Sequence, residues 1–529
     1  MNEHFFDRNG YLELLRKRIG SLKDGYRQNM AILGDELVGK SSMILKFLDS
    51  FVDTRTLALY IEIRPEPLAG FARRFIGIML YNFLLNSETP LKEDLEFLIT
   101  KSSAYIPKTC EKIRAILAAL EKRKKNNVFT ELLGLCDLFY QETGKFCVVI
   151  LDEFHHFESF GVKNLYAEWQ KLLIVQKTTL YILVSSLKHK AKTILSKNLA
   201  LLFGNFEIIT VEPFDIKTSE SYLRCRLDEA RLDKGLVNFI VHFTGGIPFY
   251  LDILSQAFLH SKERTITDIL EAMLLEPSGI LHQRFSNYLN RFLDTPHNQD
   301  YLAILYQVAS GHNKIKEISQ ILEKPKKELD PRLNHLLDFN CLSRSGDFVT
   351  LNDRVFGFWL KFVYQQKLHS LSFNGQNQKM LFRGKIEKMI QEFLANSQKP
   401  LTERVAELLR LFEDEVMQVE RKKLRLNHFR EIKPLAFNGR NLSEGLLGRS
   451  RDSIWIFAFK RDGITEDDIA EFARECKRYH HKLQRKIMVS LQEVDSNARL
   501  RALEEKIWTW DLNNLNRLLD LYSKPRIIA

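Results

Sequence analysis

The sequence has few of the features that mark secreted or membrane proteins. Its 529 residues include six cysteines, scattered without a C-x-x-C pair. This spacing argues against a disulfide framework and a structural zinc site, and it favours a reducing compartment. No apolar run reaches the roughly 18 to 20 residues of a membrane helix, and the opening residues lack the basic and apolar regions of a signal peptide. We therefore expect a cytoplasmic protein with no membrane partner.

The composition is otherwise ordinary for a globular protein. Hydrophobic residues make up 45% of the chain and charged residues 27%, which are typical proportions. The length predicts about three or four domains. The net charge of +11 suits an anionic partner such as nucleic acid, but a lysine-rich solvated surface explains it almost as well.

The strongest signal is a glycine-rich loop between an apolar strand, Met30–Leu33, and an apolar helix that is expected from Ser42. The loop has the pattern G-x-x-x-x-G-K-[ST] in the strand–loop–helix context that it requires. A chance match in a glycine-containing turn is the alternative, and this context makes it rare. The candidate binding residues are Gly34, Asp35, Glu36, Leu37, Val38, Gly39, Lys40, Ser41 and Ser42.

The residue types of this loop suit a nucleoside triphosphate. Gly34 and Gly39 let the backbone turn tightly, so that its N–H groups face phosphate oxygens. Lys40 is the type that neutralises the β- and γ-phosphates, and the Ser41 hydroxyl is a typical Mg²⁺ ligand. Because no N-K-x-D guanine-reading element follows the acidic strand, the sequence predicts ATP rather than GTP as the cofactor, together with Mg²⁺.

The second half of the expected site follows a continuous apolar run, Phe146 to Leu151, which is typical of a buried strand. Asp152 and Glu153 stand at its end. We expect Asp152 to hold the Mg²⁺ shell and Glu153 to polarise the attacking water. Two acids could equally cap a helix, but their place downstream of a phosphate loop favours the catalytic role. His155 and His156 are expected in a nearby loop, with metal ligation as the minor alternative.

A further apolar run, Leu180 to Val184, ends in Ser185 and Ser186. A polar side chain at this strand end, such as Ser185, can hydrogen-bond the γ-phosphate or the water, which is the role called sensor 1. The alternative is a serine that caps the next helix. With strands also expected at residues 56–63 and 207–211, the alternation of strands and helices predicts a parallel sheet that binds its ligand at the carboxyl ends of the strands.

Together these motifs resemble the archaeal-type AAA+/STAND P-loop ATPases, a group related to the replication-origin initiator ATPases. The resemblance covers roughly residues 5–255. It is carried by the F-x-x-R opening (Phe5 to Arg8), GDELVGKS, VVILDEF (Val148 to Phe154), the strand ending in Ser185-Ser186, and TGGIPFYL (Thr244 to Leu251). It implies a helical lid after the core, with Pro248 lying over the nucleotide and coupling its state to the domains beyond.

The chain departs from these relatives after the sensor strand. Where they often carry an arginine, this chain has Leu187 and Lys188. Arg224 or Arg226 on the lid, or an arginine from a second copy or a protein partner, could take that place. The residues leave the choice open.

Beyond the core, residues 300–364 predict a winged helix with double-stranded DNA as a candidate partner. Residues 331–339 are expected to form the helix that enters the major groove. Its candidate base contacts are Arg332, Asn334 and His335, and its candidate phosphate contacts are Lys324, Lys326 and Lys327. A spacer whose basic residues are only solvated is an equal alternative. Residues 365–378 are expected to form a linker.

The C-terminal part resembles the restriction-endonuclease-like domain that is commonly fused to these ATPases. A working nuclease of that type needs an acidic residue two positions before its lysine, but here Ala458 precedes Lys460 at that spacing. Glu431 and Asp452 are the other acidic candidates, and Asp452 is expected in a turn. We therefore expect a degenerate nuclease fold. A basic cluster could hold a phosphate backbone without cutting it, or be a solvated loop: Arg421, Lys422, Lys423 and Arg425.

The predicted fold class is α/β, with four domains: a P-loop ATPase core with a parallel sheet over residues 1–215, a helical lid over 216–296, a winged helix over 297–366, and the restriction-endonuclease-like domain over 380–529. The predicted function is an ATP-binding and hydrolysing switch whose nucleotide state is coupled to the later domains. The alternatives are an ATP-regulated DNA-binding module, an active metal-dependent nuclease, and a protein–protein signalling scaffold.

Overall fold

The computed structural model describes the chain except for residues 1–4, 86–90, 123–126, 201–205, 228–232, 261–264, 294, 370–374, 420–421, 438–441, 480–481, 493 and 529. It divides into two compact units. The first holds Met1–Phe214 with the short segments Ile247–Phe249 and Asp338–Asn340, and the second holds the remaining residues. No helix within the described ranges is both long and apolar enough to span a bilayer.

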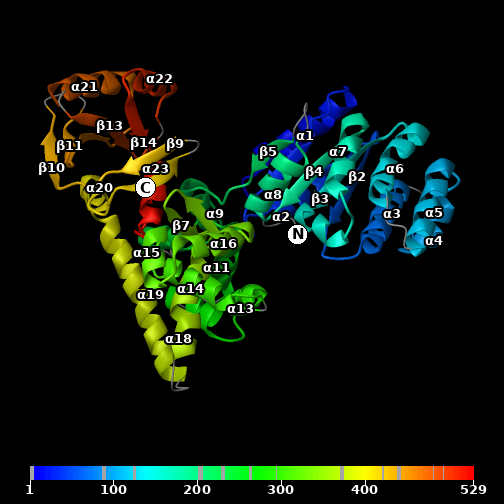
Figure 1. The fold of residues 1–529 in the computed structure, drawn as a ribbon, viewed down its shortest axis with the longest axis horizontal. Coiled ribbons are helices and arrows are strands. Elements are labelled where there is room, and N and C mark those ends of the chain that lie inside the picture. The colour runs from blue at the N-terminus through cyan, green and yellow to red at the C-terminus, as the bar shows by residue number, and fades with distance from the viewer. Residues whose placement is uncertain are drawn as a thin grey trace. The chain divides into compact units, whose positions relative to one another are not determined.

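The first unit is built on a parallel sheet (Figure 1). Its described strands lie in the order β2-β3-β4-β1-β5, and every neighbouring pair is parallel. They are β1 (Met30–Leu33), β2 (Thr56–Glu62), β3 (Phe146–Asp152), β4 (Thr179–Ser185) and β5 (Glu207–Thr210). The predicted α/β class is confirmed, and the strands lie within one residue of the ranges expected from the sequence. The phosphate-loop motif joins β1 to the next helix, which is the arrangement of P-loop NTPases.

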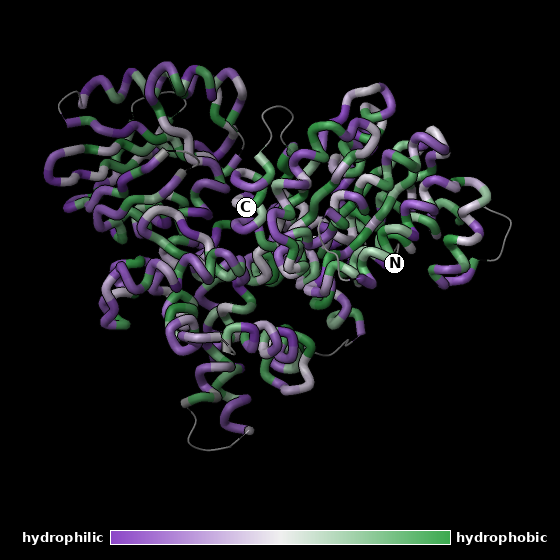
Figure 2. The backbone as a smooth tube through the Cα atoms, turned by 45° about the vertical axis from the view of Figure 1, so that its right-hand side comes forward, coloured by the Kyte–Doolittle hydropathy of each residue, from purple (hydrophilic) through white to green (hydrophobic). Residues whose placement is uncertain are grey.

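Helices cover both faces of this sheet, because the strands are apolar on both sides. Met30 and Ile32 of β1 pack with α1 (Asn9–Lys23) and α2 (Lys40–Ser50). Ala31 and Leu33 belong to the larger core on the other face. In the hydropathy-coloured backbone of Figure 2, long apolar stretches run through the first unit. The helices of that core are α3 (Leu68–Leu84), α4 (Leu95–Ser102), α5 (Pro107–Glu121), α6 (Val128–Thr143) and α7 (Leu165–Val175). Buried parallel strands with this double cover are typical of α/β proteins.

The second unit begins with helices: α9 (Ile216–Arg226), α10 (Lys234–Thr244), α11 (Pro248–His260), α12 (Ile266–Leu270), η3 (Glu271–Leu275) and α13 (Ile280–Leu293). Next come α14 (Asn298–Ala309), α15 (Ile315–Ile321), α16 (Lys326–Asp338) and the hairpin β6 (Leu342–Ser345)–β7 (Phe348–Leu351). The expected start of α16 at Pro331 is wrong. The helix begins five residues earlier because Leu329 extends the buried stripe of Leu333 and Leu336 by one turn, and this outweighs the hydrogen bond that Pro331 cannot make.

The linker expected over residues 365–378 is also wrong where the structure describes it. Residues 370–374 lie outside the described ranges, and helices flank them: α18 (Gln365–His369) and α19 (Gly375–Ser397). Residues 375–378 of the expected linker form the first turn of α19, a long helix that buries only Phe382, Ile386 and Phe393. Helix α19 packs on the lid, because Arg383 pairs with Asp268 and Glu271.

The C-terminal part holds a mixed sheet in the order β10-β11-β12-β13-β14. Its strands are β10 (Glu431–Ala436), β11 (Glu444–Arg449), β12 (Ile454–Lys460), β13 (Leu483–Ser490) and β14 (Ile507–Trp510). Helices α20 (Leu401–Leu409) and α23 (Leu512–Leu521) pack on one face, and α21 (Glu466–Cys476) and α22 (Ser496–Glu504) on the other. The sequence prediction missed β11 and the hairpin β8 (Glu415–Val419)–β9 (Lys422–Leu426).

A group of charged side chains connects distant segments of the second unit. Asp520 on α23 accepts hydrogen bonds from Arg354, which begins α17 (Arg354–Trp359), and from Arg526. The backbone N–H of Arg526 donates to His242 on α10 at 3.3 Å. Burial and the neighbouring Arg354 and Arg526 hold the pKa of His242 well below its usual range, so it is neutral.

Candidate functional site

The loop between β1 and α2 needs its two glycines. Gly39 has φ of +89°, a conformation that side chains with a Cβ rarely adopt. At Gly34 a Cβ would lie 2.5 Å from the carbonyl oxygen of Val211, so no larger residue fits without displacing backbone. The loop therefore keeps a close backbone turn directly before the first turn of α2, whose N–H groups have no intrahelical acceptor. Such a helix start is an anion-binding position.

The Lys40 side chain lies over this loop. The residue is only 5% exposed, and its Nζ donates to the carbonyl oxygens of Gly34 at 3.0 Å and Asp35 at 2.7 Å. Burial lowers the pKa of Lys40, while Glu153 and Asp152 act in the opposite direction. The amine is thus placed where an anion in the loop would meet it.

Ser41 and Asp152 meet across the sheet. The Ser41 hydroxyl donates to Asp152 Oδ2 at 2.7 Å, and the Tyr60 hydroxyl of β2 donates to the same oxygen at 2.7 Å. Burial, with Asp152 beside it, raises the pKa of Tyr60, which therefore stays a neutral donor. The strand β2 positions Tyr60 because it pairs in parallel with β3, placing Glu62 beside Asp152. The two halves of the predicted site are in direct contact.

Glu153 follows β3 with φ of +53°, which turns its side chain out of the strand direction. Its Oε2 accepts from both the backbone N–H and the hydroxyl of Ser186, each at 2.9 Å. Burial raises the pKa of Glu153, and Asp152 adds to the rise, although the Ser186 N–H and Lys40 oppose it. A carboxylate with a raised pKa is a stronger base near neutral pH.

Ser185 and His155 form a second contact beside this carboxylate. Ser185 is fully buried, and its Oγ lies 2.9 Å from Nδ1 of His155, which is 3.2 Å from Glu153 Oε2. Burial lowers the pKa of His155 to about 3, and the neighbouring His156, Lys190 and Lys40 contribute. His155 is therefore neutral, and its contact with Glu153 is a polar contact between a neutral ring and a carboxyl. It lies in the short helix η1 (Phe154–Phe160) instead of the loop expected for it.

Two other charged residues support the loop. Lys188 Nζ donates to Asp35 Oδ2 at 2.8 Å. Lys188 stands where the relatives often carry an arginine, and here it is hydrogen-bonded to the phosphate loop. Arg8 donates to the carbonyl oxygens of Val38 at 3.3 Å and Glu212 at 2.7 Å. Its guanidinium lies 4.8 Å from the ring centre of Phe214. The F-x-x-R opening thus contacts both the loop and the end of the core.

The remaining predicted binding residues lie around the loop. Val38 is buried, Glu36 and Leu37 are partly exposed, and the Ser42 side chain faces solvent. Pro248 begins α11 in the short segment that belongs to the first unit.

Sequence reasoning missed three side chains of this site: Tyr60, Ser186 and Lys188. Ser186 was noticed only as the neighbour of Ser185, yet Ser186 is the one that contacts Glu153. Tyr60 could have been found from its place in the second strand, two residues before the end, once β2 was known to lie beside β3. Its contact depends on strand order, which no local pattern gives.

The residues present fit a nucleotide with Mg²⁺. The hydroxyl of Ser41 and the carboxylate of Asp152 are the oxygen donors that Mg²⁺ prefers, and they lie 2.7 Å apart. At Gly39 the position of a Cβ is open space, which leaves the loop backbone accessible to a phosphate there. The Lys40 amine, whose described acceptors are the loop carbonyls, can exchange them for phosphate oxygens.

The C-terminal residues predicted for a nuclease are not brought together. Lys460 donates to Asp468 of α21 at 2.9 Å, while Glu431 pairs with Lys433 and Arg449. Asp452 is exposed in a turn. Across the described ranges, no three His, Cys, Asp or Glu side chains are grouped to hold a metal ion.

The basic cluster near residue 421 is only partly described. Arg421 lies outside the described residues and the side chain of Lys422 is not described, while Arg425 pairs with Asp414 at 3.2 Å. Lys423 is exposed on β9.

In the winged helix, part of the predicted DNA contacts are engaged internally. Arg332 and Lys324 both pair with Asp300, and His335 stacks on Tyr301 with ring centres 4.7 Å apart. The other candidates, Asn334, Lys326 and Lys327, are exposed.

No family model matches the chain, and no curated protein matches it. Among solved structures it is similar to the Walker-type ATPase PABY2304 of Pyrococcus abyssi, at 19% identity and a TM-score of 0.47, over 68% of this chain and 97% of that one. It is also similar to the ORC2 protein of Aeropyrum pernix in its ADPNP–ADP complexes, at 12% identity and a TM-score of 0.39, over 74% and 98% of the two chains. The ORC1 protein of the same organism, in complex with DNA, matches at 11% identity and a TM-score of 0.34, over 67% and 92%.

Proposed function

We propose that the chain binds ATP with Mg²⁺ and hydrolyses it to ADP and phosphate. The observation that carries this proposal is the 2.7 Å contact between Ser41 of the phosphate loop and Asp152 at the end of β3. These residues are 111 positions apart in the sequence, and both halves of a nucleotide site are needed for hydrolysis.

In this mechanism the backbone N–H groups of the loop and of the first turn of α2 bind the phosphates. Lys40 turns from the loop carbonyls to the phosphate oxygens and balances their charge. Ser41 and Asp152 would hold Mg²⁺, which, when bound, neutralises charge on the β- and γ-phosphates. Tyr60 keeps Asp152 oriented through its hydrogen bond to Oδ2.

Glu153 is proposed as the base that orients the attacking water and accepts its proton. The described hydrogen bonds of this carboxylate all fall on Oε2, so Oε1 is the oxygen that would take the proton. Ser185 is proposed as a positioning residue, because its hydroxyl contacts the ring of His155, which in turn contacts Glu153. This differs from the direct γ-phosphate contact expected of Ser185, since its neighbour Ser186 is the residue that holds the base.

We further propose that the nucleotide state is coupled to the lid, the winged helix and the C-terminal domain, and that double-stranded DNA is a partner. In support, the Pro248 segment belongs to the first unit, while α10 before it and most of α11 after it belong to the second. Arg226 pairs with Asp252 within the lid, and Arg224 is exposed. An arginine supplied by Arg224, a second copy or a protein partner is therefore part of the proposal.

The test compares Lys40→Ala with Lys177→Ala. Lys177 is an exposed lysine just before β4, at the opposite end of the strands from the site. We expect the Lys40 variant to lose ATP binding and hydrolysis, and the Lys177 variant to keep both. Calorimetric titration with Mg-ATP and Mg-GTP measures binding, and phosphate release with and without duplex DNA measures turnover. Equal ATP affinity in the two variants would contradict the proposed site, and faster turnover with DNA would support the coupling.

A further inference from the structure

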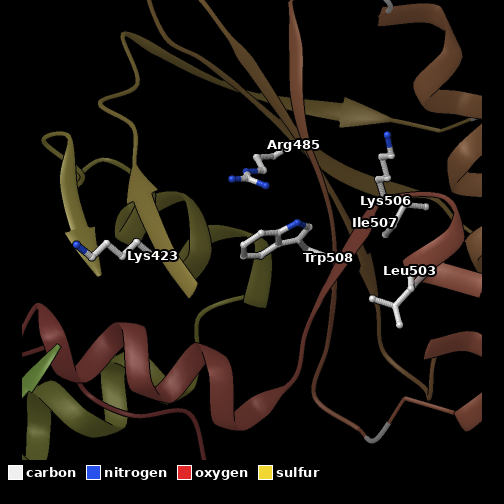
Figure 3. A pocket seen from close by; sticks show the side chains of 7 residues that line it. Lys423, Arg485, Leu503, Lys506, Ile507 and Trp508 are labelled. Atoms are coloured by element: carbon white, nitrogen blue, oxygen red, sulfur yellow. The ribbon is translucent and has the colours of Figure 1, made fainter. Parts of the chain in front are cut away.

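The C-terminal sheet carries a hollow of about 580 Å³ that belongs neither to the phosphate loop nor to Lys460. It lies between the hairpin strand β9, the beginnings of β13 and β14, and the end of α22. Figure 3 shows Arg485 and Trp508 at its middle, with Lys423 on one side and Leu503 and Lys506 on the other.

The hollow is lined by positively charged side chains, and among the described residues these have no ion-pair partner. Its lining includes Lys423, Arg485 and Lys506, and it includes no carboxylate. In the described part of the chain, none of these three cations forms an ion pair, whereas most other charged clusters of the second unit are paired. Lys423, Arg485 and Lys506 come from three separate parts of the chain and line one hollow, which favours an anionic ligand.

Arg485 is held in place by Trp508. Its guanidinium carbon lies 4.4 Å from the centre of the indole ring, and its Nε is buried without a hydrogen-bond partner. Burial also lowers the pKa of Arg485. A guanidinium stacked on an aromatic ring is rigid and keeps its edge available, which suits bidentate binding of phosphate.

Lys506 adds a second observation. It has φ of +55° between α22 and β14, a conformation that glycine or asparagine adopts at lower cost. Lys506 lies in this short connection and lines the hollow. Leu503, which is 73% exposed, provides an apolar wall beside it.

The hollow is at the opposite end of the sheet from the nuclease-like position. Arg485 pairs with Trp455 near the start of β12, whereas Lys460 is the last residue of that strand and pairs with Ser490. A ligand of this hollow is therefore not in the place where a nuclease of this fold would cut.

We propose that this hollow binds a single strand of nucleic acid, with phosphates on Arg485, Lys423 and Lys506 and an unpaired base against Trp508 and Leu503. The aromatic and apolar wall favours a base over an acidic peptide, which would supply negative charge but no flat ring. Stacking on a side chain requires a base that is free of its duplex, which favours a single strand over duplex DNA. This inference does not rest on nucleotide hydrolysis.

Lys506→Gly is the most discriminating variant, because glycine accepts the backbone conformation of Lys506 while the charge is removed. The chain offers a matched control in Lys482→Gly. Lys482 is exposed in the same domain and also has a positive φ, +76°, but it does not line the hollow. Both variants of the full chain are titrated with fluorescein-labelled poly-dT, without nucleotide, and anisotropy is followed at several salt concentrations.

We expect Lys506→Gly to weaken binding several-fold. The slope of log K against log salt concentration should become less steep by about 0.7, the value for one lost phosphate contact. Lys482→Gly should leave both unchanged. Arg485→Gln and Trp508→Leu should each weaken binding about tenfold or more, and their thermal unfolding is recorded to confirm that they fold. Equal affinity of the two glycine variants would overturn the proposal.

Four other anionic competitors test whether the ligand is a single strand: thymidine monophosphate, inorganic phosphate, poly-glutamate and duplex DNA. Unlabelled poly-dT should displace the labelled strand, while thymidine monophosphate and inorganic phosphate should do so only at much higher concentration. Poly-glutamate should compete weakly. If a mononucleotide, phosphate, poly-glutamate or duplex DNA displaced the labelled strand as well as poly-dT does, the hollow would not be a single-strand site and the proposal would fail.

Discussion

Strands β3 and β12 are both apolar and both end in polar residues, but the polar residues at the two ends have different kinds of partner. Strand β3 ends in Asp152, with Glu153 after it, where a serine from the phosphate loop and a tyrosine from β2 converge on Asp152. Strand β12 ends in Lys460, whose amine donates a hydrogen bond to Asp468. The Asp468 carboxylate also accepts from the hydroxyl of Thr465, the N-cap residue of α21. The first end is an assembled polar site, and the second is part of the structural framework.

The comparison teaches that a motif residue is informative only when its partners come from elsewhere in the chain. Asp152 meets groups from helix α2 and strand β2, while Lys460 meets a carboxylate eight residues away. Partners from distant segments do not suffice, because in the second unit Asp520 pairs with Arg354 and Arg526 as part of the framework. The following predictions test this comparison.

The largest effect is expected in the pH dependence of ATP hydrolysis. Glu153 acts as a base only when ionised, and burial raises its pKa above the ordinary carboxyl value of about 4.3. The rate should therefore fall about tenfold for each pH unit below this raised pKa. Steady-state kcat/KM across pH, with Mg-ATP binding measured in parallel, gives the profile. If kcat/KM stayed constant as the pH fell to the ordinary carboxyl pKa, Glu153 would not be the base.

Asp520→Asn should lower the free energy of unfolding by about 2 kcal/mol, the value of a charge-assisted hydrogen bond. Burial raises the pKa of Asp520, but Arg354 and Arg526 lower it by more, so this pKa lies below its ordinary value. Its stabilisation is therefore complete above the ordinary pKa of about 3.9 and is lost as pH falls through the lowered value. Urea unfolding at neutral pH should give a lower free energy of unfolding for Asp520→Asn than for Asp452→Asn, which changes an exposed carboxylate and serves as the control. Equal stability of the two variants would show that the charges do not hold the parts together.

Lys460→Ala should have a smaller effect, about 1 to 2 kcal/mol of unfolding free energy, because it leaves the Asp468 carboxylate without its cation. ATP hydrolysis should not change, and neither the parent chain nor the variant should cut DNA with Mg²⁺. The exposed Lys477 gives a control for charge in the same domain, Lys477→Ala. Metal-dependent cleavage that disappears with Lys460→Ala would break the comparison, because Lys460 would then be catalytic.

Most of the first unit could be predicted from sequence, because its parallel strands are continuous apolar runs with clear ends. The same rule failed where structure depends on packing between distant segments. The polar residues of 365–378 suggested a linker, although the described ones belong to α18 and to the largely exposed first turn of α19. The hairpin β8–β9 was missed because β9, KKLRL, alternates charged with apolar residues in a short run that was taken for a basic loop.

The candidate site was predicted where its residues belong to a local motif and missed where they do not. Lys40, Ser41 and Asp152 belong to local patterns with a known chemistry. Tyr60 and Ser186 reach the site from β2 and from the end of β4. Their roles depend on strand order and on the turn at Glu153, whose φ is positive. Neither feature leaves a signature in a single sequence.

The most direct test of the central claim is single-turnover hydrolysis of ATP by Glu153→Gln. Glutamine keeps the size of the side chain but cannot accept the proton, so we expect ATP to bind as in the parent chain while turnover falls by about 100-fold or more. Glu168→Gln, which changes an exposed glutamate of α7, should hydrolyse ATP at the parent rate. Unchanged turnover in Glu153→Gln would contradict the account, because the polar end of β3 would then be structural, as that of β12 is.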